Sequence, residues 1–284
     1  MADISTHEKP TEAPSTTLLS VRDLGKTYPG SAGSDAVEAI RSISFDVRAG
    51  ELVCIVGPSG CGKTTLLKCL SGLLAPTTGS VALDGETVLA PPRKMAVVFQ
   101  EYGRSLYPWL SVRDNVGLPL KSRGMPRGER DDVVRAALEE VGLGQALTTF
   151  PWQLSGGMQQ RVAIARAIAY QPEVLVMDEP FAAVDAQTRA DLEDLVRRVW
   201  QDLGVTVLFV THDIDESVYL GERVLVLSSS PTVVQEDLVV DLPAERDQIS
   251  TRALPRFTEL RTHVHQQIQR AKRGDRTGLP ATPR

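Results

Sequence analysis

One short stretch limits the folds open to this chain more than any other feature. It reads Gly57-Pro58-Ser59-Gly60-Cys61-Gly62-Lys63-Thr64 and fits the phosphate-binding pattern G-x-x-x-x-G-K-[ST]. The apolar run at 51–56 before it is typical of a buried strand, and residues 64–70 after it are typical of a helix. A strand, a glycine-rich loop and a helix in this order predict a phosphate-binding loop at the centre of an α/β fold.

The residue types in this loop suit the binding of an anion. Glycines let the backbone curl until several N–H groups face one phosphate, and the N-terminus of the next helix adds partial positive charge. Lys63 is expected to reach the β- and γ-phosphates, and the Thr64 hydroxyl to bind Mg²⁺. A glycine-rich turn ahead of a helix is the simpler alternative. The predicted nucleotide-binding residues here are Gly57, Pro58, Ser59, Gly60, Cys61, Gly62, Lys63, Thr64 and Thr65.

Composition and charge argue against several classes of function. The chain has 284 residues, of which 42% are hydrophobic, and its formal net charge is -5. Nucleic-acid binders usually carry a basic face, so no nucleic-acid partner is expected. Cys54, Cys61 and Cys69 have neither C-x-x-C spacing nor a histidine cluster beside them, which argues against a zinc site and a disulfide framework. Reduced thiols fit a cytoplasmic protein.

The two ends of the chain differ from the rest. Residues 1–17 are rich in Ser, Thr, Pro and Glu, lack the apolar core of a secretory signal, and are predicted to be a disordered tail. Residues 274–284 are predicted to be a second disordered tail. No apolar run reaches the roughly 18 residues that a membrane-spanning helix needs. If the protein works at a membrane, we expect another chain to span it.

Between the tails, strands and helices alternate. Strands are predicted at 18–21, 36–47, 80–83, 86–89, 95–99, 173–177, 205–210 and 223–227, with an aromatic-bearing turn at 24–29 and an Asp-Gly hairpin turn at 84–85. The strand at 36–47 is predicted at a sheet edge or in a hairpin. Helices are predicted at 112–121, 129–141, 157–169, 187–203 and 252–273. This alternation predicts an α/β fold with a mostly parallel sheet, an antiparallel β part and an inserted helical subdomain at about 105–156.

A pair of acidic residues extends the candidate site. The apolar run 174–177 ends in Asp178 and Glu179. In enzymes with a phosphate-binding loop, an Asp at such a strand end holds Mg²⁺. Glu179, one residue further on, is placed to take a proton from an attacking water. The alternative is an acidic helix cap after a core strand.

A second candidate anion site precedes the helix predicted at 157–169. Leu154 is followed by Ser155, Gly156 and Gly157. A Ser hydroxyl and free N–H groups at a helix N-terminus can bind an anion, and the two glycines suit close approach of the backbone to a ligand. Ser155 could instead serve only as the N-cap of the helix.

The order of these motifs resembles that of the ATP-binding cassette (ABC) ATPases, a class of P-loop NTPases. The phosphate loop, Gln100, the signature at 154–157, the acidic pair and His212 follow one another as in that family, over residues 18–227. The resemblance implies ATP and Mg²⁺ as ligands and ATP hydrolysis as the activity. It also implies a head-to-tail dimer, in which Ser155, Gly156 and Gly157 of one subunit cap the γ-phosphate on the phosphate loop of the other. The partner is a second copy or a similar chain.

Matching positions imply the remaining roles. Tyr28 resembles the aromatic that stacks on adenine, the alternative being a packed edge aromatic. Gln100 resembles the glutamine that touches Mg²⁺ and water, and His212 the histidine that holds the γ-phosphate and orients the water. Asp185 resembles the Asp of the loop that links the two ATP sites, although the family more often has Ser and Leu around it. The predicted catalytic residues are Glu179, His212, Lys63 and Gln100, and the predicted metal ligands are Thr64, Gln100 and Asp178.

Two stretches narrow the resemblance to importers. Residues 102–112 and 211–228 look like those in the ATPase subunits of importers for nitrate, sulfonates, taurine and related small anions, and residues 241–247 agree. This implies integral membrane permease subunits as partners, an extracytoplasmic solute-binding protein as an indirect partner, and a peripheral position at the cytoplasmic face of the cell membrane. Tyr107 and Trp109 either line a groove for a short permease helix or pack in the core of the helical subdomain.

Other classes of function compete with this interpretation. A soluble ABC ATPase acting on ribosomes or DNA usually has two cassettes or a long coiled-coil insertion, and a basic surface. The Ser-Gly-Gly signature and the acidic pair argue against a nucleotide kinase or a GTPase switch, and an exporter ATPase is usually fused to membrane segments. The predicted ATPase domain covers 18–235, and a C-terminal extension follows at 236–273.

Overall fold

The computed structural model describes residues 17–30, 35–100, 105–182 and 184–273. The predicted tails, apart from Thr17, therefore lie outside the described residues, as do 101–104 after Gln100. The strands are β1 Thr17–Tyr28, β2 Val37–Arg48, β3 Leu52–Val56, β4 Thr78–Leu83, β5 Glu86–Thr87, β6 Met95–Val98, β7 Val174–Asp178, β8 Thr206–Thr211, β9 Arg223–Leu227 and β10 Thr232–Val239. The helices are α1 Lys63–Leu70, α3 Val112–Ser122, α4 Arg127–Glu140, α5 Gly156–Ala169, α6 Ala186–Leu203, α7 Ile214–Leu220 and α8 Pro255–Arg273. None of these helices is long and apolar enough to cross a membrane.

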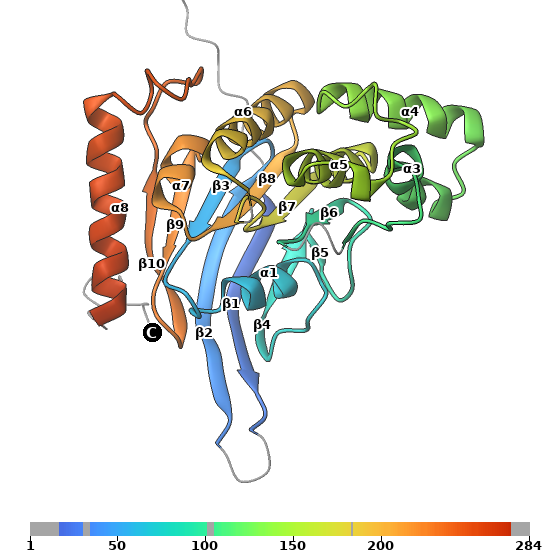
Figure 1. Cartoon of the computed structure of the whole chain (residues 1–284). Coiled ribbons are helices and arrows are strands. Elements are labelled where there is room, and N and C mark those ends of the chain that lie inside the picture. The colour runs from blue at the N-terminus through green and yellow to red at the C-terminus, as the bar shows by residue number, and fades with distance from the viewer. Residues whose placement is uncertain (1–16, 31–34, 101–104, 183, 274–284) are drawn as a thin grey trace, which may run out of the picture.

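Within the described residues, ten strands form one sheet in the order β5-β4-β1-β2-β10-β9-β3-β8-β7-β6. The strands from β9 to β6 run parallel to one another, whereas β5, β4, β1 and β2 are antiparallel. β10 joins the two parts, because it pairs parallel with β2 and antiparallel with β9. The predicted combination of a parallel sheet with an antiparallel part is confirmed (Figure 1).

The parallel strands are buried on both faces, and β3 is buried at all five positions. Val53 and Ile55 belong to an apolar core that also contains α1 and residues of β1 and β2. Leu52, Cys54 and Val56 belong to a second core with residues of α5, α6 and α7. Alternate side chains of one strand thus hold α1 on one face and the larger helices on the other, as expected of a sheet covered on both faces.

Helices α3, α4 and α5 pack against one another on the side away from α8 (Figure 1). The predicted helices at 112–121, 129–141 and 157–169 are confirmed within two residues at each end. Val134, Ala137 and Leu138 of α4 are buried at helical spacing. The apolar face of α4 therefore meets α3 and α5, and the helices form a compact lobe beside β6.

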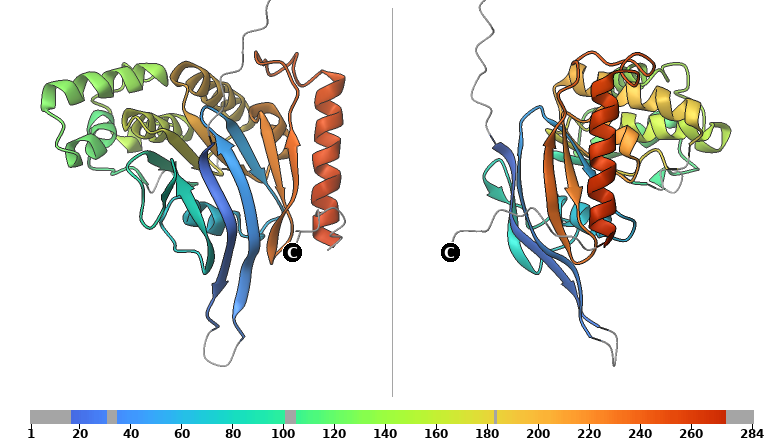
Figure 2. Two further views of the ribbon diagram at one scale, coloured as in Figure 1. Left: turned by 180° about the vertical axis from the view of Figure 1, so that it is seen from behind. Right: turned by 90° about the vertical axis from the view of Figure 1, so that its left-hand side faces the viewer.

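Helix α8 stands along β9 and β10 at the opposite side of the molecule (Figure 2). Phe257, Leu260, Val264 and Ile268 are buried, so α8 has one packed face and one solvated face. The prediction of a helix in this region is confirmed, with its start at Pro255. β10 crosses residue 235, and the predicted border between the ATPase domain and its extension stays a prediction.

One expectation about secondary structure was wrong, and two elements were not predicted. The segment 24–29 is not a turn, because β1 continues to Tyr28 through a series of register shifts against β2. Asp23 lies at φ 45° at one of these shifts, and such bulges break the alternation of apolar residues. Of the two positions predicted for the strand at 36–47, the hairpin is confirmed, because β2 pairs antiparallel with β1 and lies inside the sheet. β10 and α7 were not predicted, because β10 is half polar and α7 has only seven residues.

Candidate active site

Four neighbouring parallel strands bring the predicted residues to one edge of the sheet. The strands lie in the order β3-β8-β7-β6, and their registers pair Val56 with Thr211 and Asp178 with Val210. The phosphate loop follows β3, His212 follows β8, and the acidic pair ends β7. Ligands of open α/β sheets bind outside such carboxyl ends. The strand register therefore explains why residues far apart in sequence meet here.

The loop between β3 and α1 is bent as the motif predicts. Gly60 and Gly62 lie at φ 74° and 100°, which side chains rarely allow. The Lys63 ammonium group donates to the carbonyl oxygens of Gly57 and Pro58 at 3.1 and 3.3 Å. A cation is thus held inside the curl of the loop, and it is almost entirely shielded from solvent.

The Cys61 side chain fills the space beneath this loop. Its thiol is buried, and a side chain at Gly57 would lie 2.9 Å from its sulfur. Burial raises the pKa of the Cys61 thiol, while nearby Lys63 partly opposes the shift. Cys61 therefore supports the loop from inside as a small apolar group.

Asp178 and Thr64 provide the donors expected of a magnesium site. Burial raises the pKa of Asp178, and a hydrogen bond from the Thr64 hydroxyl acts in the opposite direction. Asp178 Oδ1 is buried and has no hydrogen-bond partner among the described residues. Among the described residues, no group of three or more His, Cys, Asp or Glu side chains could form a metal site made of protein ligands alone. Mg²⁺ bound to a nucleotide needs only one or two protein oxygens besides phosphate and water, so this pair fits it.

Three polar side chains converge on Glu179. Its carboxylate oxygens lie 2.9 Å from His212 Nδ1, 3.5 Å from Gln100 Nε2 and 3.6 Å from Lys63 Nζ. The Glu179 backbone has φ 43° and its N–H donates to the Val210 carbonyl at 2.8 Å. A non-glycine residue in this region costs on the order of 1–3 kcal/mol and is typical of functional sites. In this backbone conformation the Glu179 side chain lies within 3.6 Å of Lys63 in the phosphate loop.

Tyr28 lies beside the start of α1. Its hydroxyl is 3.2 Å from the Thr65 hydroxyl, and the Lys26 ammonium group is 5.5 Å from the ring centroid. The side chain is 37% exposed. The side chain is thus partly exposed beside the phosphate loop, and both the stacking role and its alternative, a packed aromatic, stay predictions.

The signature motif begins α5. The Ser155 hydroxyl accepts a hydrogen bond from the Met158 N–H at 3.3 Å, so Ser155 is the N-cap, and both Ser155 and Gly156 are exposed. A side chain at Gly157 would lie 2.3 Å from Thr188 Cγ2 of α6. Gly157 thus has a packing role that was not foreseen from the sequence.

Asp185 begins α6. Its carboxylate accepts from the Thr188 N–H at 3.0 Å and from the Thr188 hydroxyl at 2.7 Å, and these bonds lower the pKa of Asp185. Within the described residues, no hydrogen bond or ion pair joins Ser155 or Asp185 to the phosphate loop of the same chain. Helix α5 packs against α3, α4 and α6, whereas α1 packs against β2 and β7. The fold therefore gathers the predicted residues around the phosphate loop but leaves the signature residues 155–157 and Asp185 apart from it.

Tyr107 and Trp109 lie on the surface of the helical lobe. They are 41% and 70% exposed, and their ring centroids are 5.3 Å apart. The buried Asn115 side chain accepts from the Tyr107 N–H and donates to the Tyr107 and Leu110 carbonyls, which fixes the turn between them. This exposure argues against core packing, and the groove for a permease helix stays a prediction.

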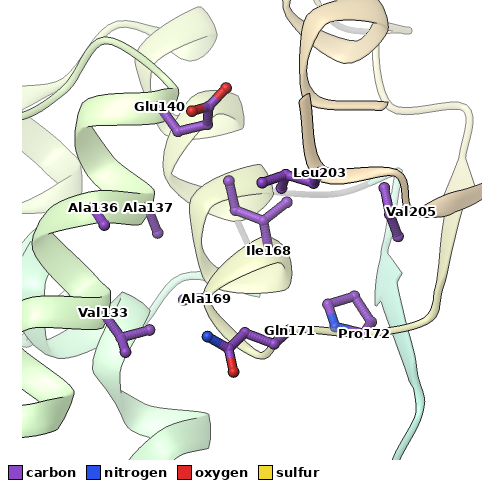
Figure 3. Close-up of a pocket in the computed structure, with 10 residues that line it drawn as sticks. All are labelled: Val133, Ala136, Ala137, Glu140, Ile168, Ala169, Gln171, Pro172, Leu203 and Val205. Carbon is purple, nitrogen blue, oxygen red and sulfur yellow. The ribbon is translucent and has the colours of Figure 1, made fainter. Parts of the chain in front are cut away.

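A cavity of about 370 Å³ lies away from this site, between α4, α5 and α6 (Figure 3). It is lined mainly by alkyl side chains, with Glu140 and Gln171 as its polar residues. Among the described residues that line it, none is a cation or part of a glycine-rich loop for a phosphate. Sequence reasoning missed a different group, Thr211, Arg189 and Glu216, which lies behind His212. The only feature of the sequence that pointed to this group was the three acidic residues within 213–216.

The fold and the site together define a P-loop nucleotide hydrolase. A family profile described as ABC transporter matches residues 40–182. A nitrate import ATP-binding protein, NrtD, from Synechocystis sp. is 43% identical over 82% of this chain and 86% of its own length. A taurine import ATP-binding protein, TauB, from Roseobacter denitrificans is 38% identical over 87% of this chain and 92% of its own length.

Solved structures agree with these relatives. The dimeric ABC transporter cassette MJ0796 superposes with a TM-score of 0.69 at 33% identity, over 78% of this chain and 99% of that one. A post-hydrolysis form of the same cassette, bound to ADP and Pi, gives a TM-score of 0.68 at 32% identity, over the same shares of the two chains. The chain belongs to the ABC transporter family as an ATP-binding cassette, and it is an ATPase.

Proposed function

We propose that this cassette powers an importer for a small anion such as nitrate, a sulfonate or taurine. The observation that carries the proposal is the similarity to nitrate and taurine import proteins over more than four-fifths of the chain. The alternative, a soluble ABC ATPase acting on ribosomes or DNA, has no comparable support. The acidic net charge of the chain also argues against it.

ATP binding is assigned to the loop and its surroundings. Backbone N–H groups of 57–65 and the Lys63 ammonium group bind the phosphates. Tyr28 stacks on the adenine ring, which its exposed face allows. Asp178, the Thr64 hydroxyl and Gln100 hold Mg²⁺, which neutralises developing charge on the phosphates when bound. The unpartnered Asp178 oxygen supports this assignment.

Hydrolysis is assigned to the side chains around Glu179. Its carboxylate orients the attacking water and accepts its proton. His212, 2.9 Å from that carboxylate, fixes the carboxylate and stabilises the γ-phosphate as charge moves onto it. Lys63, at the start of α1, and Gln100, after β6, approach Glu179 from other elements. Catalysis is thus positioning and charge stabilisation by groups that are already assembled.

The second half of each site is assigned to another cassette. Ser155, Gly156 and Gly157 cap the γ-phosphate bound by the partner, and Asp185 links the two sites. The exposed N-terminus of α5, which has no bond to its own phosphate loop in the described residues, supports this arrangement. The similarity to a dimeric cassette supports it as well. The partner is a second copy or a similar chain.

The membrane partner is assigned to the helical lobe. The exposed Tyr107 and Trp109 pair offers an apolar surface for a short helix of the permease. The cassette then lies at the cytoplasmic face of the membrane, and a solute-binding protein on the other side acts on it only through the permease. In this proposal residues 18–235 form the ATPase domain and 236–273 an extension.

Partner capture tests the proposal. Tagged protein is recovered from native membranes in mild detergent, and its partners are identified by mass spectrometry. We expect a multi-spanning membrane protein in roughly equal amount. Trp109→Ala should lose it while the isolated ATPase stays active. Trp152→Ala, which also removes a tryptophan that is 70% exposed, should retain it. Recovery only with ribosomal or DNA-bound partners would favour the soluble alternative.

A further inference from the structure

A buried acidic side chain lies directly behind His212. Glu216, in the first turn of α7, is 5% exposed. Its carboxylate accepts a hydrogen bond from the Thr211 hydroxyl at 2.6 Å. The same hydroxyl accepts from the Asp213 N–H at 2.9 Å. The two residues that flank His212 are thus tied to one side chain, which fixes the backbone from which the imidazole reaches Glu179.

Arg189 of α6 connects this group to the start of its own helix. Its guanidinium nitrogens lie 3.6 Å from Glu216 and 3.4 Å from Asp213. The Arg189 N–H donates to the Asp185 carbonyl at 2.9 Å, and its guanidinium reaches the Val184 carbonyl at 3.5 Å. The network therefore runs from the His212 loop to the Asp185 end of α6.

The network also borders the reacting groups. A cavity of about 30 Å³ is lined by Glu179, His212, Arg189 and Glu216. The Arg189 Nε–H is buried and has no hydrogen-bond partner among the described residues. It faces Glu216 at ion-pair distance, so the loop position depends on the charge of Glu216.

We propose that Glu216 is a positioning residue for ATP hydrolysis: through the Thr211 hydroxyl and Arg189, its carboxylate holds the His212 loop against the Asp185 end of α6. The inference rests on the role proposed above for His212. It adds to that role a path from the His212 loop to the N-terminal end of α6, where Asp185 is proposed to link the two ATP sites. Glu216 does not touch the substrate in this account, and it acts only through His212 and α6.

Several charged groups determine how this carboxylate titrates. Burial raises the pKa of Glu216 to about 7, and Asp213 and Glu193 add to the rise. The Thr211 hydrogen bond and Arg189 oppose it. On β3 the nearby Cys54 is a buried thiol whose own pKa is raised, so it is neutral. From α8, Arg261 pairs with Asp215 instead. Ionisation near neutral pH thus strengthens the attraction to Arg189 and tightens the loop.

The test uses the purified full-length protein and its steady-state ATPase activity. Glu216→Gln keeps an acceptor for Thr211 but removes the charge that attracts Arg189. We expect kcat at pH 8 to fall about tenfold, with KM for ATP within twofold. Wild-type kcat should drop between pH 8 and pH 6 more steeply than that of the variant. Both proteins keep His212, so the difference between the two profiles reports Glu216.

Matched variants separate positioning from simple structural support. Glu193→Gln removes another buried acid, one that pairs with Arg252, and should leave kcat at pH 8 unchanged. Because Glu193 helps to raise the pKa of Glu216, this variant should keep the drop in kcat but move it to lower pH. Thr211→Val should lower kcat as Glu216→Gln does, whereas Thr211→Ser, which keeps the hydroxyl group, should have wild-type kcat. The double variant Thr211→Val/Glu216→Gln should have a kcat no lower than that of either single variant. If Glu216→Gln fails to fold, the Thr211 pair decides the question.

Failures of this inference and failures of the proposed site can be told apart. An inactive His212→Ala beside a Glu216→Gln with wild-type kcat and pH profile would overturn this inference and leave the proposed site intact. The inference also fails if Thr211→Val keeps wild-type kcat, or if Glu193→Gln matches Glu216→Gln in both kcat and pH profile. A fully active His212→Ala would instead remove the proposed catalytic role of His212, and this inference with it.

Discussion

The contact between Gly157 and Thr188 allows a sharp test of why the signature motif contains its second glycine. In Gly157→Ala the new Cβ would lie 2.3 Å from Thr188 Cγ2, more than 1 Å inside the roughly 3.5–4.0 Å separation of carbon atoms in contact. Thr188 cannot rotate freely, because its hydroxyl donates to Asp185. We therefore expect both that α5 is strained against α6 and that the Asp185 cap loses that hydrogen bond as Thr188 turns.

The size of the effect follows from three contributions. Overpacking costs about 1–3 kcal/mol, and a lost hydrogen bond costs about 1 kcal/mol. Alanine in place of glycine returns up to about 1 kcal/mol of helix propensity. We expect a net loss of about 2 kcal/mol in the free energy of unfolding, measured by urea titration with tryptophan fluorescence.

A second substitution makes the test decisive. Thr188→Ser removes the clashing methyl group and keeps the hydroxyl bond to Asp185. Gly157→Ala/Thr188→Ser should therefore be within about 0.5 kcal/mol of Thr188→Ser alone, since the two positions are coupled. The packing argument is refuted if Gly157→Ala is as stable as wild type, or if the double variant is as unstable as Gly157→Ala. A stable but inactive double variant would add close approach to a ligand as a second reason for the glycine.

Three further predictions concern the site. Lys63→Ala should weaken ATP binding by about 10- to 100-fold in calorimetry, because a charge-assisted hydrogen bond is worth about 1.5–3 kcal/mol; unchanged affinity would contradict the role of Lys63. Asp178→Asn should bind ATP as tightly as wild type without Mg²⁺, but should lose most of the increase in ATP affinity that Mg²⁺ gives. An equal increase in the wild type and the variant would remove Asp178 from the metal site. Because the pKa of Glu216 is raised from 4.5 to about 7, its favourable contribution to stability is complete below pH 4.5 and is lost as pH rises through 7. Glu216→Gln should therefore reduce the pH dependence of unfolding between pH 5 and 8 by about 3 kcal/mol, and an unchanged dependence would disprove the shift.

The sequence predicted most of the parallel sheet and the groups at its edge. Strands such as β3 are continuous apolar runs, and the loops after them carry motif residues at fixed offsets. Once β3, β8, β7 and β6 are parallel neighbours, their carboxyl ends must meet. Lys63, Asp178, Glu179, His212 and Gln100 are therefore close in space, as expected from their places in the sequence.

What the sequence did not predict depends on contacts between distant residues. The bulges of β1 hide its apolar alternation, and β10 is recognisable only from its partners β2 and β9. The tie between Thr211 and Glu216 requires α7, which is too short for a clear helical period. The clash at Gly157 depends on how closely α5 approaches α6, which no local pattern encodes.

The central claim is that two such cassettes enclose ATP between the phosphate loop of one and the Ser155 signature of the other. It is tested most directly with Glu179→Gln, which keeps the binding groups but removes the carboxylate assigned to water activation. Light scattering with ATP and Mg²⁺ should give twice the monomer mass, and Ser155→Arg in the same background should return the monomer, because a bulky side chain blocks the cap. A monomer in Glu179→Gln at saturating ATP and Mg²⁺ would contradict the account.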